Sequence, residues 1–236
     1  MVNNKLPKYL SLWQNHLDID SVKDWCGSYN VPWKKQIRKH IQDENYRSVL
    51  DCGAGVFSEY FGFKDDNYDI KYTATEITQK YVDYGISNGI DVVSGSIDNL
   101  QFEDNSFDCC ICLDVLNCQL EYETSIKEML RVAKKEVIIT FFKPFEDDPE
   151  GKYQLDDSKR QFECIKSDYG TIVNRNLHDG EVVAIQHFFN RKKLKNFLSK
   201  LKVNYEFFEI IKHKPENLPQ PHDGRQITLH ITKNQK

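Results

Sequence analysis

The sequence predicts an α/β protein with one seven-stranded, mostly parallel sheet, helices on both faces of the sheet, and an antiparallel last strand. Two observations carry this prediction. Through residues 46–142, short apolar runs typical of buried strands alternate with stretches of helical periodicity. Near the C-terminus, two further strand-like runs follow one another with no helix between them, which indicates an antiparallel pair at one edge of the sheet.

Five strands are expected in the first part of the chain, after an aromatic, helical segment of about 45 residues. Their sequences are RSVLDC (47–52), IKYTATEI (70–77), DVVSG (91–95), SFDCCICLD (106–114) and KEVIITFF (135–142). Helices are expected to start at VFSEYF (56–61) and to cover TQKYVDYGISNG (78–89) and YETSIKEMLRVAK (122–134).

The alternation stops after residue 142. The next segment contains turn residues and two alternating runs, GTIVNRN (170–176) and EVVAIQHFF (181–189), which predict a hairpin with LHDG as its turn. A helix at NRKKLKNFLSKLK (190–202) and the strands VNYEFFEIIKH (203–213) and RQITLHIT (225–232) complete the sheet.

These elements divide the chain into four parts. We expect an N-terminal helical cap (1–45), a ligand-binding core (46–142), an inserted cap over the substrate (143–186), and the C-terminal part of the core (187–236).

Composition excludes several classes of protein. The net charge of −4 and the pI near 6.0 show no single-sign field that would attract nucleic acid or a membrane. The 7 cysteines are odd in number and several lie in apolar runs, which indicates free thiols in a reducing compartment. The N-terminus has no apolar stretch of the signal-peptide kind, so we expect a cytoplasmic protein. Without a CxxC pair or zinc-like Cys/His spacing, we expect no metal.

The stretch RSVLDCGAGVFSEYF joins the first strand to the next helix and is the first candidate ligand site. Gly53 and Gly55 allow a tight turn that a ligand can approach closely. A dinucleotide fingerprint needs a third glycine, and Ser58 stands in its place. Asp51, directly before the turn, would repel a pyrophosphate but would attract an amino group. Glu76 ends the second strand, where a carboxylate can accept both hydroxyls of a ribose.

Four motifs in order carry a family resemblance. VLDCGAG, ATEIT, GSIDNLQFEDNSFDCCICLDVLN and EMLRVAKKEVIIT resemble the class I S-adenosylmethionine-dependent methyltransferases, and most of all the small-molecule type related to ubiquinone and menaquinone biosynthesis. The resemblance covers residues 47–142, with a weaker similarity at 188–201. It implies a Rossmann-like fold, S-adenosylmethionine as the cofactor, and methyl transfer as the activity.

The resemblance also implies roles at the methionine end of the cofactor. Asp51, Gly53 and Gly55 would line the methionine part, with Asp51 near its amino group. Leu113 and Asp114, at the end of the fourth strand, would lie beside the methionine and the reactive sulfur.

Further residues are implied at the nucleoside end. Glu76 would bind the ribose hydroxyls, Ile77 would pack on the adenine, and Ile97 would offer its backbone N–H to an adenine nitrogen. Ser96 stands where many members of the family have an aspartate facing the adenine amino group. That departure weakens adenine recognition at this position or passes it to Asp98.

No catalytic signature is obligatory, because methyl transfer from a sulfonium needs mainly proximity and alignment. The candidates are His187, Asn117 and Asp114, with an ordinary packing or capping role as the alternative for the first two. His178, Asp168 and Tyr169 in the insertion are further candidates, for which we favour a surface role.

The expected function is therefore O- or N-methylation of a small molecule. The LDVLNCQ sequence after the fourth strand lacks the motif of enzymes that methylate exocyclic base amines. Two alternatives stay open: a methyltransferase acting on RNA or protein, and a non-catalytic protein that binds S-adenosylmethionine. We expect no membrane partner, and the oligomeric state is open.

Overall fold

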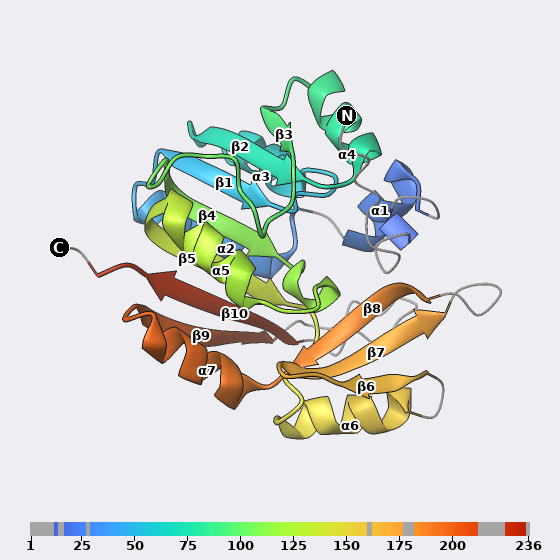
Figure 1. Ribbon diagram of the computed structural model, residues 1–236. Coiled ribbons are helices and arrows are strands. Elements are labelled where there is room, and N and C mark those ends of the chain that lie inside the picture. The colour runs from blue at the N-terminus through green and yellow to red at the C-terminus, as the bar shows by residue number, and fades with distance from the viewer. Residues whose placement is uncertain are drawn as a thin grey trace.

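A seven-stranded sheet runs through the molecule (Figure 1). The computed structural model describes residues 12–13, 17–26, 29–159, 162–176, 182–211 and 225–234. The sheet has the order β3-β2-β1-β4-β5-β10-β9. Its strands are β1 (Ser48–Cys52), β2 (Lys71–Glu76), β3 (Val92–Ser94), β4 (Phe107–Leu113), β5 (Ala133–Phe141), β9 (Asn204–Ile211) and β10 (Arg225–Thr232).

All neighbouring strands pair in parallel except β10, which is antiparallel to both β5 and β9. The predicted fold class is confirmed. The two C-terminal strands form the expected antiparallel pair, with β9 at the edge and β10 inside it.

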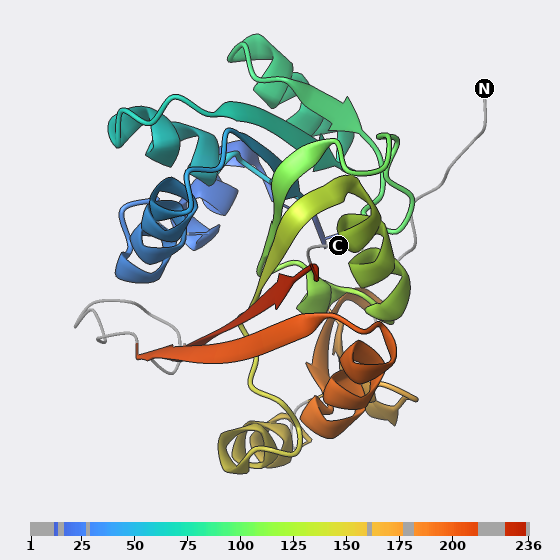
Figure 2. The same ribbon diagram turned by 90° about the vertical axis from the view of Figure 1, so that its left-hand side faces the viewer.

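The central strands are apolar on both faces because helices cover both faces (Figure 2). Helices α2 (Pro32–Asp43) and α3 (Ser58–Asp65) pack on the face that carries Val49 and Ile138. On the opposite face lie α5 (Glu123–Val132) and α7 (Arg191–Lys200). The cysteines from Cys52 to Cys164 are free thiols, and four of them are buried in β1 and β4.

Two helices lie near the β3 edge and the glycine turn. Helix α4 (Gln79–Ser87) packs beside β3, and α1 (Ile19–Cys26) contributes Val22 to a small cluster with Tyr81 of α4 and Val56 of the turn. Among the described residues, none of the helices is both long and apolar enough to cross a membrane.

The insertion contains more regular structure than its sequence predicts. Strands β6 (Cys164–Lys166), β7 (Gly170–Asn176) and β8 (Val182–Phe189) form a separate antiparallel sheet. Strands β7 and β8 are the expected hairpin strands, while the LHDG turn lies outside the described residues. Strand β8 continues past residue 186, where we placed the end of the insertion.

Helix α6 (Pro149–Ser158) and strand β6 were not predicted. Helix α6 buries only Gly151 and Leu155, so its apolar stripe is too short for periodicity to reveal. Gly151 fits tightly, because a Cβ there would lie 1.7 Å from the carbonyl oxygen of Phe145. Leu155 packs against Val173 and Phe188 of the small sheet, a tertiary contact that the local sequence pattern does not reveal.

Candidate functional site

The turn between β1 and α3 needs both of its glycines, for different reasons. Gly53 and Gly55 have φ angles of +77° and +55°. The Gly53 N–H donates to the carbonyl oxygen of Thr75 at 2.8 Å, which ties the turn to the end of β2. A Cβ on Gly53 would lie 2.8 Å from Cγ2 of Val115, whereas a Cβ on Gly55 would have no atom within 4 Å. Gly55 therefore faces open space that a ligand can enter.

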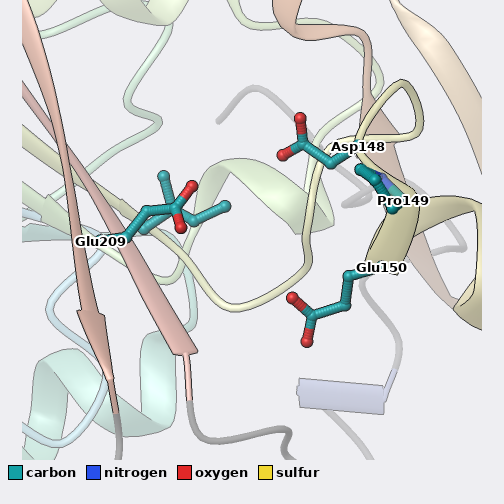
Figure 3. A pocket seen from close by; sticks show the side chains of 5 residues that line it. Asp148, Pro149, Glu150 and Glu209 are labelled. Carbon is teal, nitrogen blue, oxygen red and sulfur yellow. The ribbon is translucent and has the colours of Figure 1, made fainter.

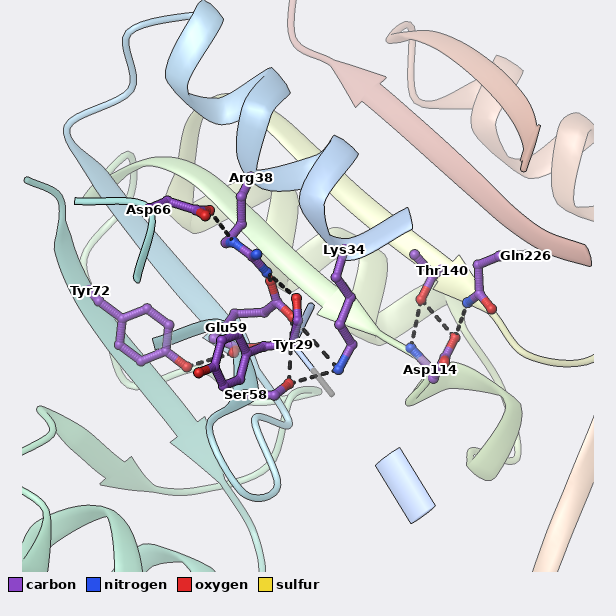
Figure 4. Close-up of polar contacts among 11 residues, drawn as sticks. Tyr29, Lys34, Arg38, Ser58, Glu59, Asp66, Tyr72, Asp114, Thr140 and Gln226 are labelled. Carbon is purple, nitrogen blue, oxygen red and sulfur yellow. Dashed lines mark hydrogen bonds and ion pairs between the residues drawn. The ribbon is translucent and has the colours of Figure 1, made fainter. Parts of the chain in front are cut away.

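Asp51 is a buried carboxylate at the carboxyl end of β1. Its side chain accepts a hydrogen bond from the Tyr72 hydroxyl at 2.6 Å (Figure 4). Only 3% of the residue is exposed, and burial raises the pKa of its carboxyl to about 7. Such a group favours a cationic partner, because a nearby positive charge would restore its ionised form.

Glu76 lies at the end of β2, beside the glycine turn. Its Oε2 accepts from the Gly55 N–H at 2.9 Å and its Oε1 accepts from the Thr78 N–H at 2.8 Å. These bonds orient the carboxylate, and burial raises its pKa. Asp51 and Glu76 thus flank the same turn, as the sequence predicts for two strand ends at one edge of a parallel sheet.

The loop after β3 comes next to Glu76. The Gly95 N–H donates to the Glu76 carbonyl at 3.0 Å, which brings residues 95–98 to the end of β2. The Ile97 side chain is buried in the core on the α5 face, Ser96 is half-buried and Asp98 is exposed. Ile77, directly after Glu76, is half-buried. The nucleoside candidates therefore follow the ends of β2 and β3, which one backbone hydrogen bond holds together.

Asp114 follows β4 with a φ angle of +61°. Its Oδ1 accepts from the Thr140 hydroxyl at 2.7 Å, and the Gln226 side-chain amide donates to the same oxygen (Figure 4). The carboxylate is therefore turned toward β5 and β10. Its neighbour Leu113 packs partly buried against the core on the α2 face.

A buried ionic network beside this site was missed at the sequence level. Lys34 Nζ on α2 donates to the Ser58 hydroxyl at 2.8 Å and lies 3.7 Å from Oε1 of Glu59 (Figure 4). Arg38 Nη1 donates to Oε2 of Glu59 at 3.0 Å, and Arg38 Nε donates to Asp66 at 2.6 Å. The sequence contains a clue to this network, because Lys34 and Arg38 are four residues apart and share the buried face of α2.

His187 and Asn117 join the insertion to the core. His187 is fully buried, with Nε2 2.9 Å from the Ser167 hydroxyl and Nδ1 3.0 Å from the Gln119 carbonyl oxygen. Asn117, in the 3-10 turn η3 (Leu116–Cys118), donates from Nδ2 to the His187 carbonyl at 2.7 Å.

Burial lowers the pKa of His187 to about 4, so its imidazole is neutral at physiological pH. Both of its ring nitrogens are engaged inside the protein. These contacts are those of positioning residues, while a catalytic role for His187 or Asn117 stays a prediction. Of the weaker candidates, Tyr169 packs on Tyr122, Asp168 is exposed, and His178 lies outside the described residues.

A cavity of about 200 Å³ lies between the start of α6 and strands β9 and β10. Its lining residues are Asp148, Pro149, Glu150, Glu209 and Ile227. Figure 3 shows the carboxylates of Glu150 and Glu209 on opposite sides of this space. Arg191 pairs with Asp148 at 2.6 Å and with Glu209 at 3.2 Å, so part of the acidic charge is neutralised.

Comparison with known proteins agrees with this architecture. Residues 50–141 match a family model described as a methyltransferase domain. A search of curated protein sequences finds no match.

Solved structures share the fold at low sequence identity. A SAM-dependent methyltransferase from Methanosarcina mazei aligns with a TM-score of 0.61 and 16% identity, over 79% of this chain and 92% of its own. Magnesium protoporphyrin IX methyltransferase from Synechocystis PCC 6803, with bound SAH, gives 0.57 and 15%, over 85% and 81%. A SAM-dependent methyltransferase from Thermotoga maritima, described as a possible histamine N-methyltransferase, gives 0.53 and 18%, over 80% and 83%.

The residues of the site fit S-adenosylmethionine. The buried Asp51 carboxylate suits an ammonium group, the open side of Gly55 admits a ligand, and Glu76 offers oxygens to hydroxyl groups. Residues 50–141 thus match a methyltransferase domain, and the chain has the fold of the S-adenosylmethionine-dependent methyltransferases with which it aligns.

Proposed function

We propose that the protein methylates a small-molecule acceptor at oxygen or nitrogen. The observation that carries this proposal is the pair of buried carboxylates, Asp51 and Glu76, on either side of an open glycine turn. The pair suits a ligand with an ammonium group at one end and a ribose at the other.

When bound, S-adenosylmethionine supplies a methyl group on a sulfonium, which is a good leaving group. The chain would hold the methionine end of this ligand by charge. Asp51 would accept hydrogen bonds from the ammonium group, and Lys34, whose side chain is only 5% exposed beside Ser58, would face the carboxylate. Gly53 and Gly55 would keep the backbone close to the ligand without side chains in the way.

At the nucleoside end, Glu76 would bind the ribose hydroxyls. Ile77 would pack on the adenine, and the Ile97 backbone N–H would reach an adenine nitrogen. Ser96 or Asp98 would contact the adenine amino group, in the loop that Gly95 ties to the end of β2.

The acceptor would enter between the core and the insertion. The acidic cavity at Asp148, Glu150 and Glu209 suits an amine or a neutral acceptor and disfavours a phosphate-rich one. The Thermotoga maritima neighbour, described as a possible histamine N-methyltransferase, is consistent with an amine. Asp114, held by Thr140 and Gln226, is a further candidate to orient the acceptor or take its proton.

Calorimetric titration with S-adenosylmethionine and S-adenosylhomocysteine tests the cofactor site. We expect micromolar binding of both ligands. Asp51→Asn and Glu76→Gln should each weaken binding by at least about 30-fold, the counterpart of about 2 kcal/mol for a lost charged hydrogen bond. The exposed Asp69→Asn serves as the matched control. Equal affinity in all four proteins would contradict the assignment.

A screen of amines, phenols, RNA and peptides for release of S-adenosylhomocysteine tests the acceptor class. Turnover with a small molecule supports the proposal. Turnover with RNA or peptide alone would replace it with the first alternative function, and binding without any turnover would favour a regulatory binding protein.

A further inference from the structure

Three potential metal ligands converge far from the glycine turn. They are His40 near the end of α2, Glu136 near the start of β5, and His230 on β10. His40 Nε2 lies 2.8 Å from Oε2 of Glu136, and His230 Nδ1 lies 2.7 Å from Oε1 of Glu136. All three donor atoms lie within 4.8 Å of one another.

The sheet register explains why these residues meet. Residue His230 pairs with Ile138 and Thr232 pairs with Glu136, so His230 and Glu136 are diagonal neighbours on one face. That face is the one covered by α2, whose last turn brings His40 over the two strands. The imidazole rings of His40 and His230 meet edge to face, with centroids 4.8 Å apart.

The surroundings favour a cation that enters from solvent. The Glu136 side chain is 2% exposed, and the Tyr46 hydroxyl donates to its Oε2 at 3.1 Å, which holds the carboxylate in place. The His40 side chain is 34% exposed, so one side of the cluster is open to solvent.

The donor spacing lies close to that of a zinc site. Zinc takes nitrogen and oxygen ligands at about 2.0–2.2 Å, so two ligands in a tetrahedral site lie about 3.3 Å apart. The two contacts to Glu136 would each lengthen by about half an ångström, and the imidazole donors would move toward one another. A set of two imidazoles and one carboxylate binds divalent transition metals in preference to Mg²⁺ or Ca²⁺.

We propose that His40, Glu136 and His230 form a structural site for a divalent transition metal of the Zn²⁺ class, with water completing the coordination. The site cross-links α2 to β5 and β10 at the end of the sheet opposite the cofactor. Helix α2 also carries Lys34 at its other end, so the metal would hold in place the helix that faces the cofactor site. The site does not depend on the acceptor or on catalysis.

Titration of the metal-free, full-length protein with Zn²⁺ tests the site. We expect one ion bound per chain with micromolar affinity, and a rise of a few degrees in melting temperature that EDTA reverses. Glu136→Gln and His230→Gln should each lower the affinity at least about tenfold. Since the cysteines and other histidines could also bind Zn²⁺, His213→Gln serves as the matched control; His213 lies outside the described residues.

Co²⁺ absorption distinguishes this site from a cysteine site. The wild type should show visible Co²⁺ bands without a thiolate charge-transfer band. Both ligand variants should lose these bands while circular dichroism shows that they remain folded. This result supports the proposal. Two results would overturn it: no Zn²⁺ binding by the wild type, or binding that persists unchanged in Glu136→Gln and His230→Gln.

Discussion

At the scale of single residues, the cofactor site depends on buried carboxylates, whose ionised form water would stabilise and the protein interior does not. Asp51 shows this most clearly, because burial raises the pKa of its carboxyl to about 7. The folded protein therefore binds a proton there at a pH where the unfolded chain has already lost it. Ionised Asp51 lowers the stability of the ligand-free fold as the pH rises through 7, and a bound ammonium group would offset this loss.

Cofactor affinity should consequently depend on pH. As the pH rises from about 5.5 to about 7.5 and Asp51 loses its proton, the affinity for S-adenosylmethionine should increase by roughly tenfold or more. Asp51→Asn should bind weakly across the range and should lack most of this change. Over the same range, wild-type stability should fall relative to that variant. Calorimetry and chemical denaturation at each pH measure both trends, and identical pH profiles for the two proteins would contradict the prediction.

The two glycines of the turn should respond differently to alanine. Gly53→Ala should destabilise the fold by about 2–4 kcal/mol, because it adds a strained φ and a Cβ contact of 2.8 Å with Val115. Gly55→Ala should cost only about 1–2 kcal/mol of stability, since nothing lies near its Cβ. It should nevertheless weaken cofactor binding, because the methyl group enters the open space. Denaturation and calorimetry of both variants test this contrast; equal stability losses would contradict it.

At the scale of elements, α2 and α3 are joined by charges rather than by apolar contacts alone. Arg38 is fully buried between Glu59 and Asp66, and its guanidinium occupies the space next to Gly62. A buried ion pair need not add net stability, because both charges lose their hydration. Loss of a single partner is costly, since it leaves the other charge uncompensated. The network therefore ties α2 to the helix that starts at the glycine turn.

Arg38→Met should destabilise the protein by about 3 kcal/mol, because Glu59 then keeps only Lys34 as a counter-charge. Adding Glu59→Gln to this variant should restore part of the loss. Urea denaturation of the two single variants and the double variant measures the coupling. Strictly additive losses would mean that the two side chains act independently.

At the scale of the whole molecule, two polar clusters attach the insertion to the core, and one of them joins the start of α7 to Glu146, Asp147 and Asp148. The other surrounds His187. Asn117 bonds to the His187 carbonyl, and His187 reaches both Ser167 and the Gln119 carbonyl. All of these groups lie at the junction of β8 with the turn after β4. This second cluster lies in an aromatic environment that includes Phe189, and it contributes to the orientation of the insertion over the sheet.

Asn117→Ala should destabilise the protein by about 1–3 kcal/mol, because the buried His187 carbonyl loses its donor. S-adenosylmethionine affinity should stay near that of the wild type, since Asp51 and Glu76 are untouched. The exposed Asp168→Asn is the control within the insertion. Thermal denaturation and calorimetry give the two readouts; a loss of affinity at unchanged stability would show that Asn117 contacts the ligand instead.

Local sequence patterns were sufficient to predict most strands of the sheet. Strand runs such as VLDC and CCICL are apolar on both faces, which only a sheet covered on both sides allows, and the placement of Asp51 and Glu76 follows from strand ends. Helix α6 and strand β6 escaped prediction because contacts with other elements hold them: Leu155 of α6 packs on Val173 and Phe188, and β6 pairs with β7.

Sequence by itself determined the fold class, the order of strands and helices, and the glycine turn with its two carboxylates, because these features depend on hydrophobic period and on chain direction. Only the tertiary structure decided which distant side chains meet. Lys34 meets Ser58, and His187 meets Gln119. His40 and His230 both meet Glu136, from 96 and 94 residues away along the chain. The physical reason is that packing and register, rather than spacing along the chain, bring such groups within bonding distance.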